Sequence, residues 1–245
     1  MKVNFLICGV QKAGTTALAT FLVSHPEIGM ANRKEVHYFD FEKNFQNGNT
    51  DYAQYHAVFS PQPSHKLIGE ATPIYMYWHE APKRIWQYNP DMKLIAMLRN
   101  PIDRAYSHWN MEFDRKTDTL PFWEALQSEA QRCREALPHQ HRAYSYVDRG
   151  FYTEQLRRLW TYFPTEHVLV LKNEDLRDRP NETLKKVTDF LGVTPLKKIE
   201  HKEIHTRQYS SDMAEREKDY LRSVFEFEIR SLERLLGWDC SSWLK

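Results

Sequence analysis

The most constraining feature of the sequence is an apolar run that ends in a glycine-bearing loop and leads into a helical pattern. Residues 3–9 are apolar and partly β-branched, which is typical of a buried parallel strand. Residues 15–24 carry apolar side chains at helical spacing. A buried strand, a polar loop and a helix in this order predict the start of an α/β fold.

The rest of the chain continues this alternation. We expect strands within 65–73, ending near Glu70, within 92–101, ending at Arg99, and within 166–176, where a turn follows. Helices are expected over about 101–113, 121–135, 152–163, 179–193 and 212–236, with Gly192 and Gly237 ending the last two.

This order predicts one α/β domain over residues 1–245, with a central, mostly parallel sheet flanked by helices. Residues 41–65 and 114–147 are polar and irregular around the expected helix at 121–135. We expect these two segments to be insertions over the active edge of the sheet.

The first loop differs from a nucleotide-binding P-loop in the position of its lysine. The P-loop pattern is G-x-x-x-x-G-K-[ST]. Gly9 and Gly14 hold its two glycine positions, but Thr15 stands where the lysine is expected, and Lys12 lies inside the loop instead. Backbone N–H groups and the helix dipole at such a strand–loop–helix junction attract phosphate. A P-loop-like architecture follows, with the Lys12 ammonium over the mouth of the loop, where it is suited to neutralising a leaving group.

A second basic element follows the strand within 92–101. Arg99 stands at the carboxyl end of that strand, where α/β sheets place ligands. Asn100 and Pro101 are favourable first residues of a helix, and Ser107 follows about two turns later. The Arg99 guanidinium and the Ser107 hydroxyl are able to hold a second phosphate. Asp103 is expected to serve the helix dipole and local pairing.

Composition excludes several other classes of protein. Thirty-four basic and thirty-three acidic side chains give a net charge of +1, which disfavours nucleic-acid binding and a polybasic membrane anchor. The three cysteines form no C-x-x-C pair, and no His/Asp/Glu cluster has metal-ligand spacing, so no metal is expected. No stretch approaches the ~20 apolar residues of a membrane span. The first residues are too short an apolar run for a signal peptide, and a cytoplasmic location is expected.

The two phosphate elements together resemble a known family. The segments "GVQKAGTTAL" and "RNPIDRAYSHW" resemble the signatures of sulfotransferases that use 3′-phosphoadenosine 5′-phosphosulfate (PAPS). Residues 34–40, 69–75 and 149–193 resemble the sulfotransferases related to the heparan sulfate enzymes, and the C-terminal segment resembles the close of many bacterial members. The resemblance implies in-line transfer of a sulfuryl group from PAPS to a hydroxyl or amine, with 3′-phosphoadenosine 5′-phosphate (PAP) as product and no metal.

The resemblance also implies which residues hold the donor. Arg99 and Ser107 match the element for the 3′-phosphate. Relatives fold a basic loop over the donor near residues 201–212, where Arg207 is the available arginine. The loop for the 5′-phosphosulfate consists of Gln11, Lys12, Ala13, Gly14, Thr15 and Thr16.

Two residues compete for the role of base. Lys12 is expected to neutralise the leaving oxygen, and Glu35 is expected to accept the proton, because the family usually has a glutamate in this place. Burial would raise the pKa of Glu35, whereas Lys34 or Lys12 nearby would lower this pKa. The alternative is that Glu35 is a surface carboxylate paired with Lys34. His37, with an ordinary pKa of ~6.5, is the competing base. Glu70 is left open between orienting Lys12 or Arg99 and capping the following turn.

Two other functions stay open at this point. One is a P-loop kinase or NTPase for a small molecule, and the other is a non-catalytic nucleotide-binding module. The acceptor, whether a small molecule, a lipid or a carbohydrate, is not specified by the sequence. Its oligomeric state is not specified either.

Overall fold

The structure is a computed structural model that describes residues 2–46, 50–196 and 212–245. The chain falls into two compact units. The first comprises Met1–Leu98 and Arg158–His205, and the second comprises Arg99–Arg157 and Thr206–Lys245. Arg207, expected to cover the donor, lies outside the described residues. The single domain expected over 1–245 stays a prediction.

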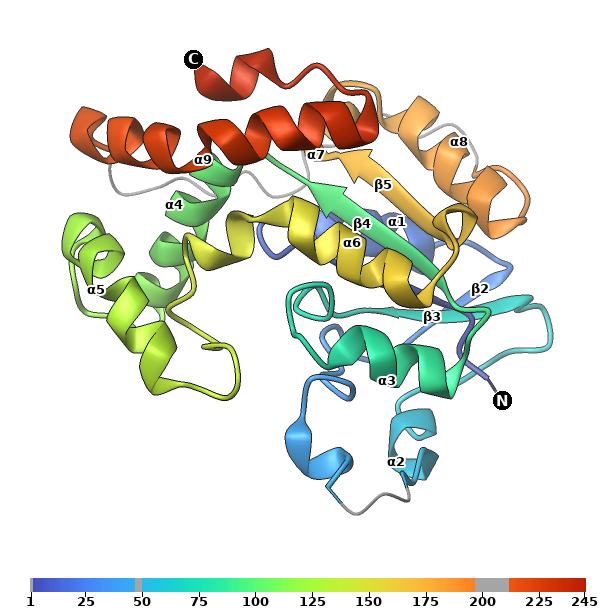
Figure 1. Cartoon of the computed structure of the whole chain (residues 1–245). Helices are drawn as coiled ribbons and strands as arrows, with labels where there is room; N and C mark the ends of the chain where they lie inside the picture. Colours follow the sequence, from blue (N-terminus) through green and yellow to red (C-terminus); the bar gives the residue numbers. More distant parts are fainter. Residues whose placement is uncertain (1, 47–49, 197–211) are drawn as a thin grey trace. The chain divides into compact units, whose positions relative to one another are not determined.

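The first unit contains the sheet (Figure 1). Its strand order is β2-β3-β1-β4-β5, and every neighbouring pair runs parallel. The α/β fold with a central parallel sheet is therefore confirmed. β1 lies between β3 and β4, and all of its residues are buried, as its apolar sequence predicts. The strands are β1 (Phe5–Gly9), β2 (Ile28–Met30), β3 (Leu67–Ala71), β4 (Lys93–Leu98) and β5 (Val168–Lys172).

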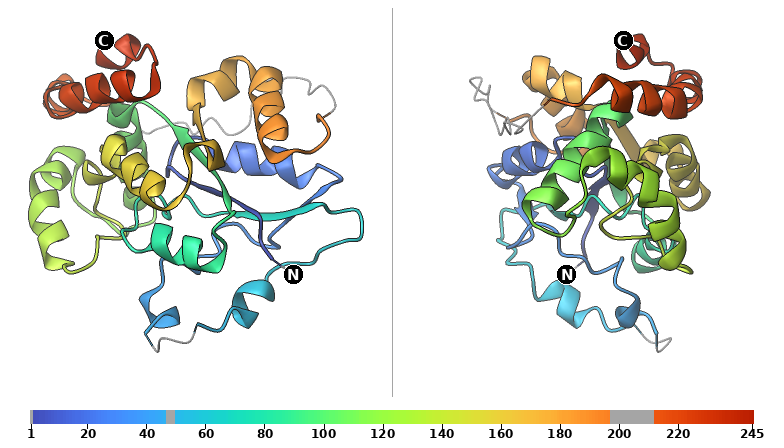
Figure 2. Two further views of the ribbon diagram at one scale, coloured as in Figure 1. Left: turned by 45° about the vertical axis from the view of Figure 1, so that its right-hand side comes forward. Right: turned by 90° about the vertical axis from the view of Figure 1, so that its left-hand side faces the viewer.

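Helices cover both faces of this sheet. α1 (Thr15–Val23) and α8 (Pro180–Leu191) lie on one face, and α3 (Ala81–Tyr88) lies on the other (Figures 1 and 2). α1 buries Leu18 and Leu22, which its helical spacing predicted. The shorter elements of this unit are η1 (Glu42–Asn44), α2 (Ala53–His56), η3 (Thr165–His167) and α7 (Asn173–Asp178).

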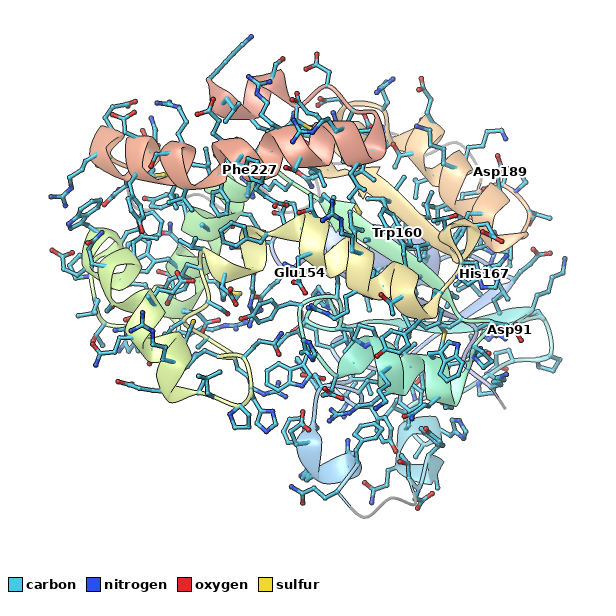
Figure 3. All side chains as sticks on the ribbon, viewed as in Figure 1. Asp91, Glu154, Trp160, His167, Asp189 and Phe227 are labelled. Atoms are coloured by element: carbon cyan, nitrogen blue, oxygen red, sulfur yellow. The ribbon has the colours of Figure 1, made fainter. Side chains whose placement is uncertain are left out.

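The second unit is helical where it is described. α6 (Tyr152–Tyr162) begins in this unit and ends in the first. Glu228 on α9 (Glu215–Leu236) accepts the backbone N–H of Thr153 at 2.7 Å and its hydroxyl at 2.8 Å, which fixes the start of α6. α9 buries Phe225 and exposes Phe227 (Figure 3). The other elements are α4 (Pro101–Asp114), α5 (Phe122–Glu135), η2 (Asp148–Gly150), α9 (Glu215–Leu236) and η4 (Ser241–Leu244).

The structure differs from the sequence-based expectation in a few elements. β2 and α3 were not predicted, and the turn expected after the strand within 166–176 is the short helix α7. The expected irregular segment 41–65 contains η1 and α2. Within the ranges 2–46, 50–196 and 212–245, the helices lack the combined length and apolar character that crossing a bilayer demands.

Candidate active site

The loop between β1 and α1 is a tight turn tied to the neighbouring strand. The Val10 N–H donates to the Met97 carbonyl at 2.8 Å, and the Ala13 N–H donates to the Val10 carbonyl at 3.2 Å. Gly14 is the N-cap of α1, and its φ of 85° lies in the left-handed region that favours glycine. The first N–H groups of a helix have no acceptor within the helix, so those of α1 and its dipole face the end of this loop.

Asn173, at the carboxyl end of β5, supports this loop through a hydrogen bond. It is the first residue of α7, directly after β5, and its amide donates to the Ala13 carbonyl at 3.1 Å. A Cβ on residue 14 would lie 2.4 Å from the Asn173 amide nitrogen, so the close approach also requires glycine there. Asn173 was not predicted, although a polar residue at the carboxyl end of a parallel strand is a common ligand position.

The three residues predicted to be catalytic share an unusual backbone conformation. Among the residues that the structure describes, the non-glycine residues with positive φ are Lys12 (72°), Glu35 (59°), His37 (57°) and Lys116 (60°). The left-handed region costs an ordinary residue about 1–2 kcal/mol. Such strain persists only where the surroundings hold it, and it gathers at functional sites. Three of these four positions are the predicted catalytic residues, whose roles stay a prediction.

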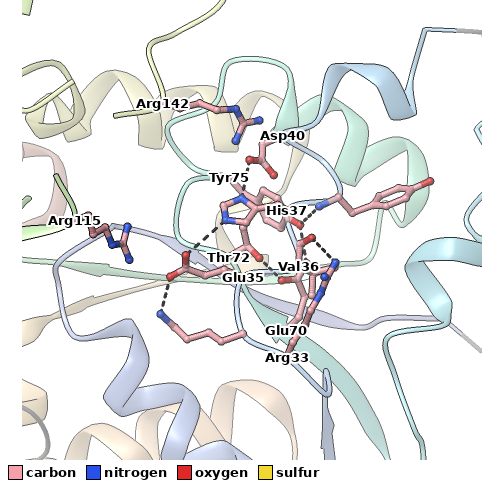
Figure 4. Close-up of polar contacts among 12 residues, drawn as sticks. Arg33, Glu35, Val36, His37, Asp40, Glu70, Thr72, Tyr75, Arg115 and Arg142 are labelled. Carbon is pink, nitrogen blue, oxygen red and sulfur yellow. Dashed lines mark hydrogen bonds and ion pairs between the residues drawn. The ribbon is translucent and has the colours of Figure 1, made fainter. Parts of the chain in front are cut away.

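Glu35, His37 and Asp40 form a connected group after β2 (Figure 4). Lys34 Nζ lies 2.8 Å from Glu35 Oε1, and His37 Nε2 lies 3.6 Å from Glu35 Oε2. On its other side, His37 Nδ1 lies 2.9 Å from Oδ2 of Asp40, which is fully buried. Asp40 was missed in the sequence, where its spacing of three residues from His37 was the available signal.

These contacts set the charges of the group. The interaction with His37, with a further contribution from Lys34, outweighs burial and lowers the pKa of Glu35 to about 2. The hydrogen bond to Asp40, followed by the interaction with Glu35, raises the pKa of His37 to about 9. At neutral pH Glu35 is therefore a carboxylate and His37 an imidazolium. Of the two candidate bases, only Glu35 is ready to accept a proton in this state.

The second phosphate element lies in the second unit, at the start of α4. The Asn100 side chain accepts the Ile102 N–H at 3.0 Å, which confirms its predicted role as N-cap. Arg99 lies 3.8 Å from Asp103, so Asp103 does provide the expected local pairing. Ser107 is buried on α4, four residues after Asp103, whereas Arg99 precedes the N-cap of that helix.

Residues 2–227 match the family of sulfotransferase domains. The chain belongs to this sulfotransferase family. Human heparan sulfate glucosamine 3-O-sulfotransferase 6 is 36% identical over 188 residues, which cover 77% of this chain and 52% of that protein. Mouse bifunctional heparan sulfate N-deacetylase/N-sulfotransferase 4 is 33% identical over 200 residues, which cover 78% of this chain and 22% of that protein. The chain thus spans about half, or less, of the length of these curated relatives.

Solved structures of sulfotransferases have the same fold. The crystal structure of a sulfotransferase from Alicyclobacillus acidocaldarius matches with a TM-score of 0.84 and 28% identity, and the match covers 100% of both chains. Mouse sulfotransferase SULT7A1, complexed with PAP, matches with a TM-score of 0.51 and 16% identity over 94% of this chain and 66% of that chain, which shows a shared fold. The resemblance seen in the two sequence signatures is therefore confirmed.

The residues of this sulfotransferase chain fit a phosphate-bearing donor at the first loop. The left-handed backbone of Gly14 shapes the turn, the start of α1 supplies N–H donors, and Lys12 adds a positive charge within the loop. Within the described ranges, no three His, Cys, Asp or Glu side chains are grouped as metal ligands.

Glu70 contacts hydroxyl groups, one of them in the turn that follows β3. It is fully buried at the end of β3, and its carboxylate accepts the hydroxyls of Tyr75 at 2.9 Å, Tyr55 at 3.3 Å and Thr72 at 2.5 Å. The Thr72 contact corresponds to the expected cap of the following turn. Burial raises the pKa of Glu70 to about 7.

A pocket of about 260 Å³ opens between α1 and the segment that follows β2. It adjoins Thr16 at the start of α1 and Lys34, the neighbour of Glu35. Its lining residues are Thr16, Ala19, Thr20 and Val23 of α1, with Met30, Ala31, Arg33, Lys34, Glu70 and Ala71.

Proposed function

We propose that the protein transfers a sulfuryl group from PAPS to a hydroxyl, or an amine, of a carbohydrate acceptor. One observation carries the proposal. His37 Nε2 lies 3.6 Å from Glu35 Oε2, and this contact lowers the pKa of Glu35. β1 and β2 belong to one parallel sheet, so the segments that follow them, with Lys12 and Glu35, leave the same sheet edge.

This arrangement assigns a role to each residue. PAPS supplies a sulfuryl group bound through oxygen to its 5′-phosphate. Glu35 takes the proton of the acceptor hydroxyl as the acceptor oxygen forms its bond to sulfur. The bond between sulfur and the phosphate oxygen breaks, and its electron pair leaves with the phosphate. Lys12 and the N-terminus of α1 stabilise the negative charge on that oxygen.

His37 supports Glu35 in this proposal and does not replace it. As an imidazolium between Asp40 and Glu35, it keeps the carboxylate ionised and oriented. A carboxylate with a pKa of about 2 is a weak base, so most of the rate must come from alignment and from charge stabilisation at the leaving oxygen.

The pocket beside α1 is the proposed entrance for the acceptor. It lies between a donor-loop residue, Thr16, and the neighbour of the base, Lys34. The names of the relatives include heparan sulfate 3-O- and N-sulfotransferases, which supports a carbohydrate and leaves both hydroxyl and amine as acceptor groups.

The test is transfer from labelled PAPS to heparan sulfate, a phenol and a lipid alcohol by the wild type and its variants. We expect Glu35→Gln to bind PAP as the wild type does and to lower kcat by about 10²-fold, the lower end of the range for a general base, because a carboxylate of low pKa is a weak base. Lys12→Ala should lower kcat by about 10²-fold. Glu27→Gln is the matched control, because Glu27 is also a lysine-paired carboxylate, 2.5 Å from Lys66, and lies outside the proposed site.

Two outcomes would change the assignment. If Glu35→Gln keeps near-normal turnover while His37→Ala abolishes it with PAP still bound, the base is His37. If the protein binds ATP and not PAP, the donor is wrong and the kinase alternative replaces it.

A further inference from the structure

The strained segment that carries Glu35 and His37 is anchored on both sides. At the start of this segment, the Glu35 N–H donates to the carbonyl of Ala71, the last residue of β3, at 3.0 Å. At its end, the Tyr38 N–H donates to the Tyr75 hydroxyl at 2.9 Å. Because positive-φ residues relax unless their neighbours hold them, these two contacts keep Glu35 and His37 in place.

The second anchor depends on a buried carboxylate (Figure 4). The Tyr75 hydroxyl that accepts the Tyr38 N–H also donates to Glu70 Oε1 at 2.9 Å. A hydroxyl has one proton and two lone pairs. Donation to Glu70 commits the proton and turns a lone pair toward the Tyr38 N–H. A carboxylate acceptor makes this hydrogen bond stronger than a neutral acceptor would.

Glu70 is itself held by two further hydroxyls. Tyr55 donates to Oε1 at 3.3 Å and Thr72 donates to Oε2, and the whole group is buried. These contacts fix the position of the Glu70 carboxylate. Its hydrogen bond with Tyr75 in turn fixes the backbone N–H of Tyr38, which lies between His37 and Asp40 in the sequence.

We propose that Glu70, acting through the Tyr75 hydroxyl, is a positioning residue that holds His37 between Asp40 and Glu35. The proposal rests on the proposed function only in that the held segment carries the base. If Glu70 had a purely structural role, removal of any of its hydroxyl donors would affect His37 equally. In the proposed role, removal of the Tyr75 hydroxyl alone affects His37.

Tyr55 and Tyr75 form a matched pair that separates the two roles. Both are buried, and both donate to the same oxygen of Glu70. The Tyr75 hydroxyl also accepts the Tyr38 N–H. Tyr55 contacts Tyr38 through the aromatic rings, whose centroids lie 4.8 Å apart, and phenylalanine at position 55 keeps this contact. Tyr75→Phe therefore breaks the anchor, and Tyr55→Phe removes a donor from the same carboxylate and leaves the anchor intact.

The experiment is an NMR pH titration of the His37 imidazole in the wild type, Tyr75→Phe and Tyr55→Phe, with Tm and labelled PAPS transfer measured alongside. In the wild type the pKa of His37 is about 9. We expect Tyr75→Phe to lower this pKa by about one, which is a tenfold rise in the acid dissociation constant of His37, and to lower kcat by about tenfold with unchanged PAP affinity. Tyr55→Phe should leave the pKa of His37 and kcat as in the wild type, because Thr72 and Tyr75 still donate to Glu70. It should lower Tm to a similar extent as Tyr75→Phe does.

Equal His37 titrations in Tyr75→Phe and Tyr55→Phe would overturn the proposal. Glu70→Gln is the second variant if Tyr75→Phe does not fold. Its amide oxygen can still accept from Tyr75 without the charge, so we expect a smaller fall in the pKa of His37, and no fall would again overturn the proposal. The titration needs no acceptor, so a selective effect of Tyr75→Phe in a protein that transfers no sulfuryl group would refute the proposed function alone.

Discussion

Replacement of Glu70 by glutamine should make the stability of the protein less sensitive to pH. Burial raises the pKa of Glu70 from 4.5 to about 7. The folded state therefore binds more protons than the unfolded state between these values, and the free energy of unfolding falls as the pH rises through them. Glutamine has the same shape and does not titrate in this range.

The size of the effect follows from the pKa difference. The interval from 4.5 to about 7 corresponds to about 3–4 kcal/mol at about 1.4 kcal/mol per pH unit. Because Glu70 is fully buried, no solvent screening reduces this value. For a chain of this length, 1 kcal/mol moves Tm by about 2–4 °C. About 2 of these pH units lie above pH 5, so between pH 5 and pH 8 the Tm of Glu70→Gln minus that of the wild type should rise by about 6–11 °C.

The assay is thermal unfolding of both proteins at several pH values between 5 and 8. Titrating groups whose pKa is the same in both proteins cancel in the difference. The small fall proposed for the pKa of His37, from about 9, adds a nearly constant offset below pH 8 and does not change the slope. Glu129→Gln is the matched control, since burial also raises the pKa of Glu129 to about 7 in the second unit. A Tm difference that stays constant with pH for Glu70→Gln, while it rises for Glu129→Gln, would refute the reasoning at Glu70.

Two further predictions concern the binding of PAP, measured by calorimetry. Asn173→Ala removes the 3.1 Å hydrogen bond to the Ala13 carbonyl, and we expect PAP affinity to fall about fivefold to tenfold, on the scale of about 1 kcal/mol. Asn89→Ala, which removes a 2.9 Å bond to the Val3 carbonyl, should cost stability alone, and an equal loss of affinity in both variants would contradict the role of Asn173. Arg99→Ala should weaken PAP by about 1.5–3 kcal/mol and leave adenosine 5′-phosphate unchanged; an equal effect on both nucleotides would remove Arg99 from the 3′-phosphate site.

The elements that the sequence predicted well are those defined by local signals. Asn100 and Pro101 mark the start of α4, and Gly192 and Gly237 end α8 and α9 with φ values of 76° and 66°. β2 was missed because three residues are too few for a pattern, and it exists by pairing with β3. Its formation depends on a partner far along the chain.

The candidate site divides in the same way. Lys12, Glu35 and His37 could be named because the motifs that contain them are continuous in sequence. The pKa direction of Glu35 could not be settled, because burial and neighbouring cations compete and only the geometry shows that His37 prevails. The role of Asn173 could not be predicted from the sequence, because it contacts a loop residue that lies 160 positions earlier in the chain.

The position of β5 at the end of the sheet has a consequence for synthesis of the chain. β4 and β5 pair through partners such as Leu94 and Val168, about 70 residues apart. While a ribosome makes the intervening segment, β4 presents an unpaired edge, which is the kind of surface that invites association between nascent chains. Asn173 directly follows β5, so its hydrogen bond to the phosphate loop forms only after this late strand has docked. The non-local pairing of the sheet thus makes the donor site one of the last parts of the molecule to mature.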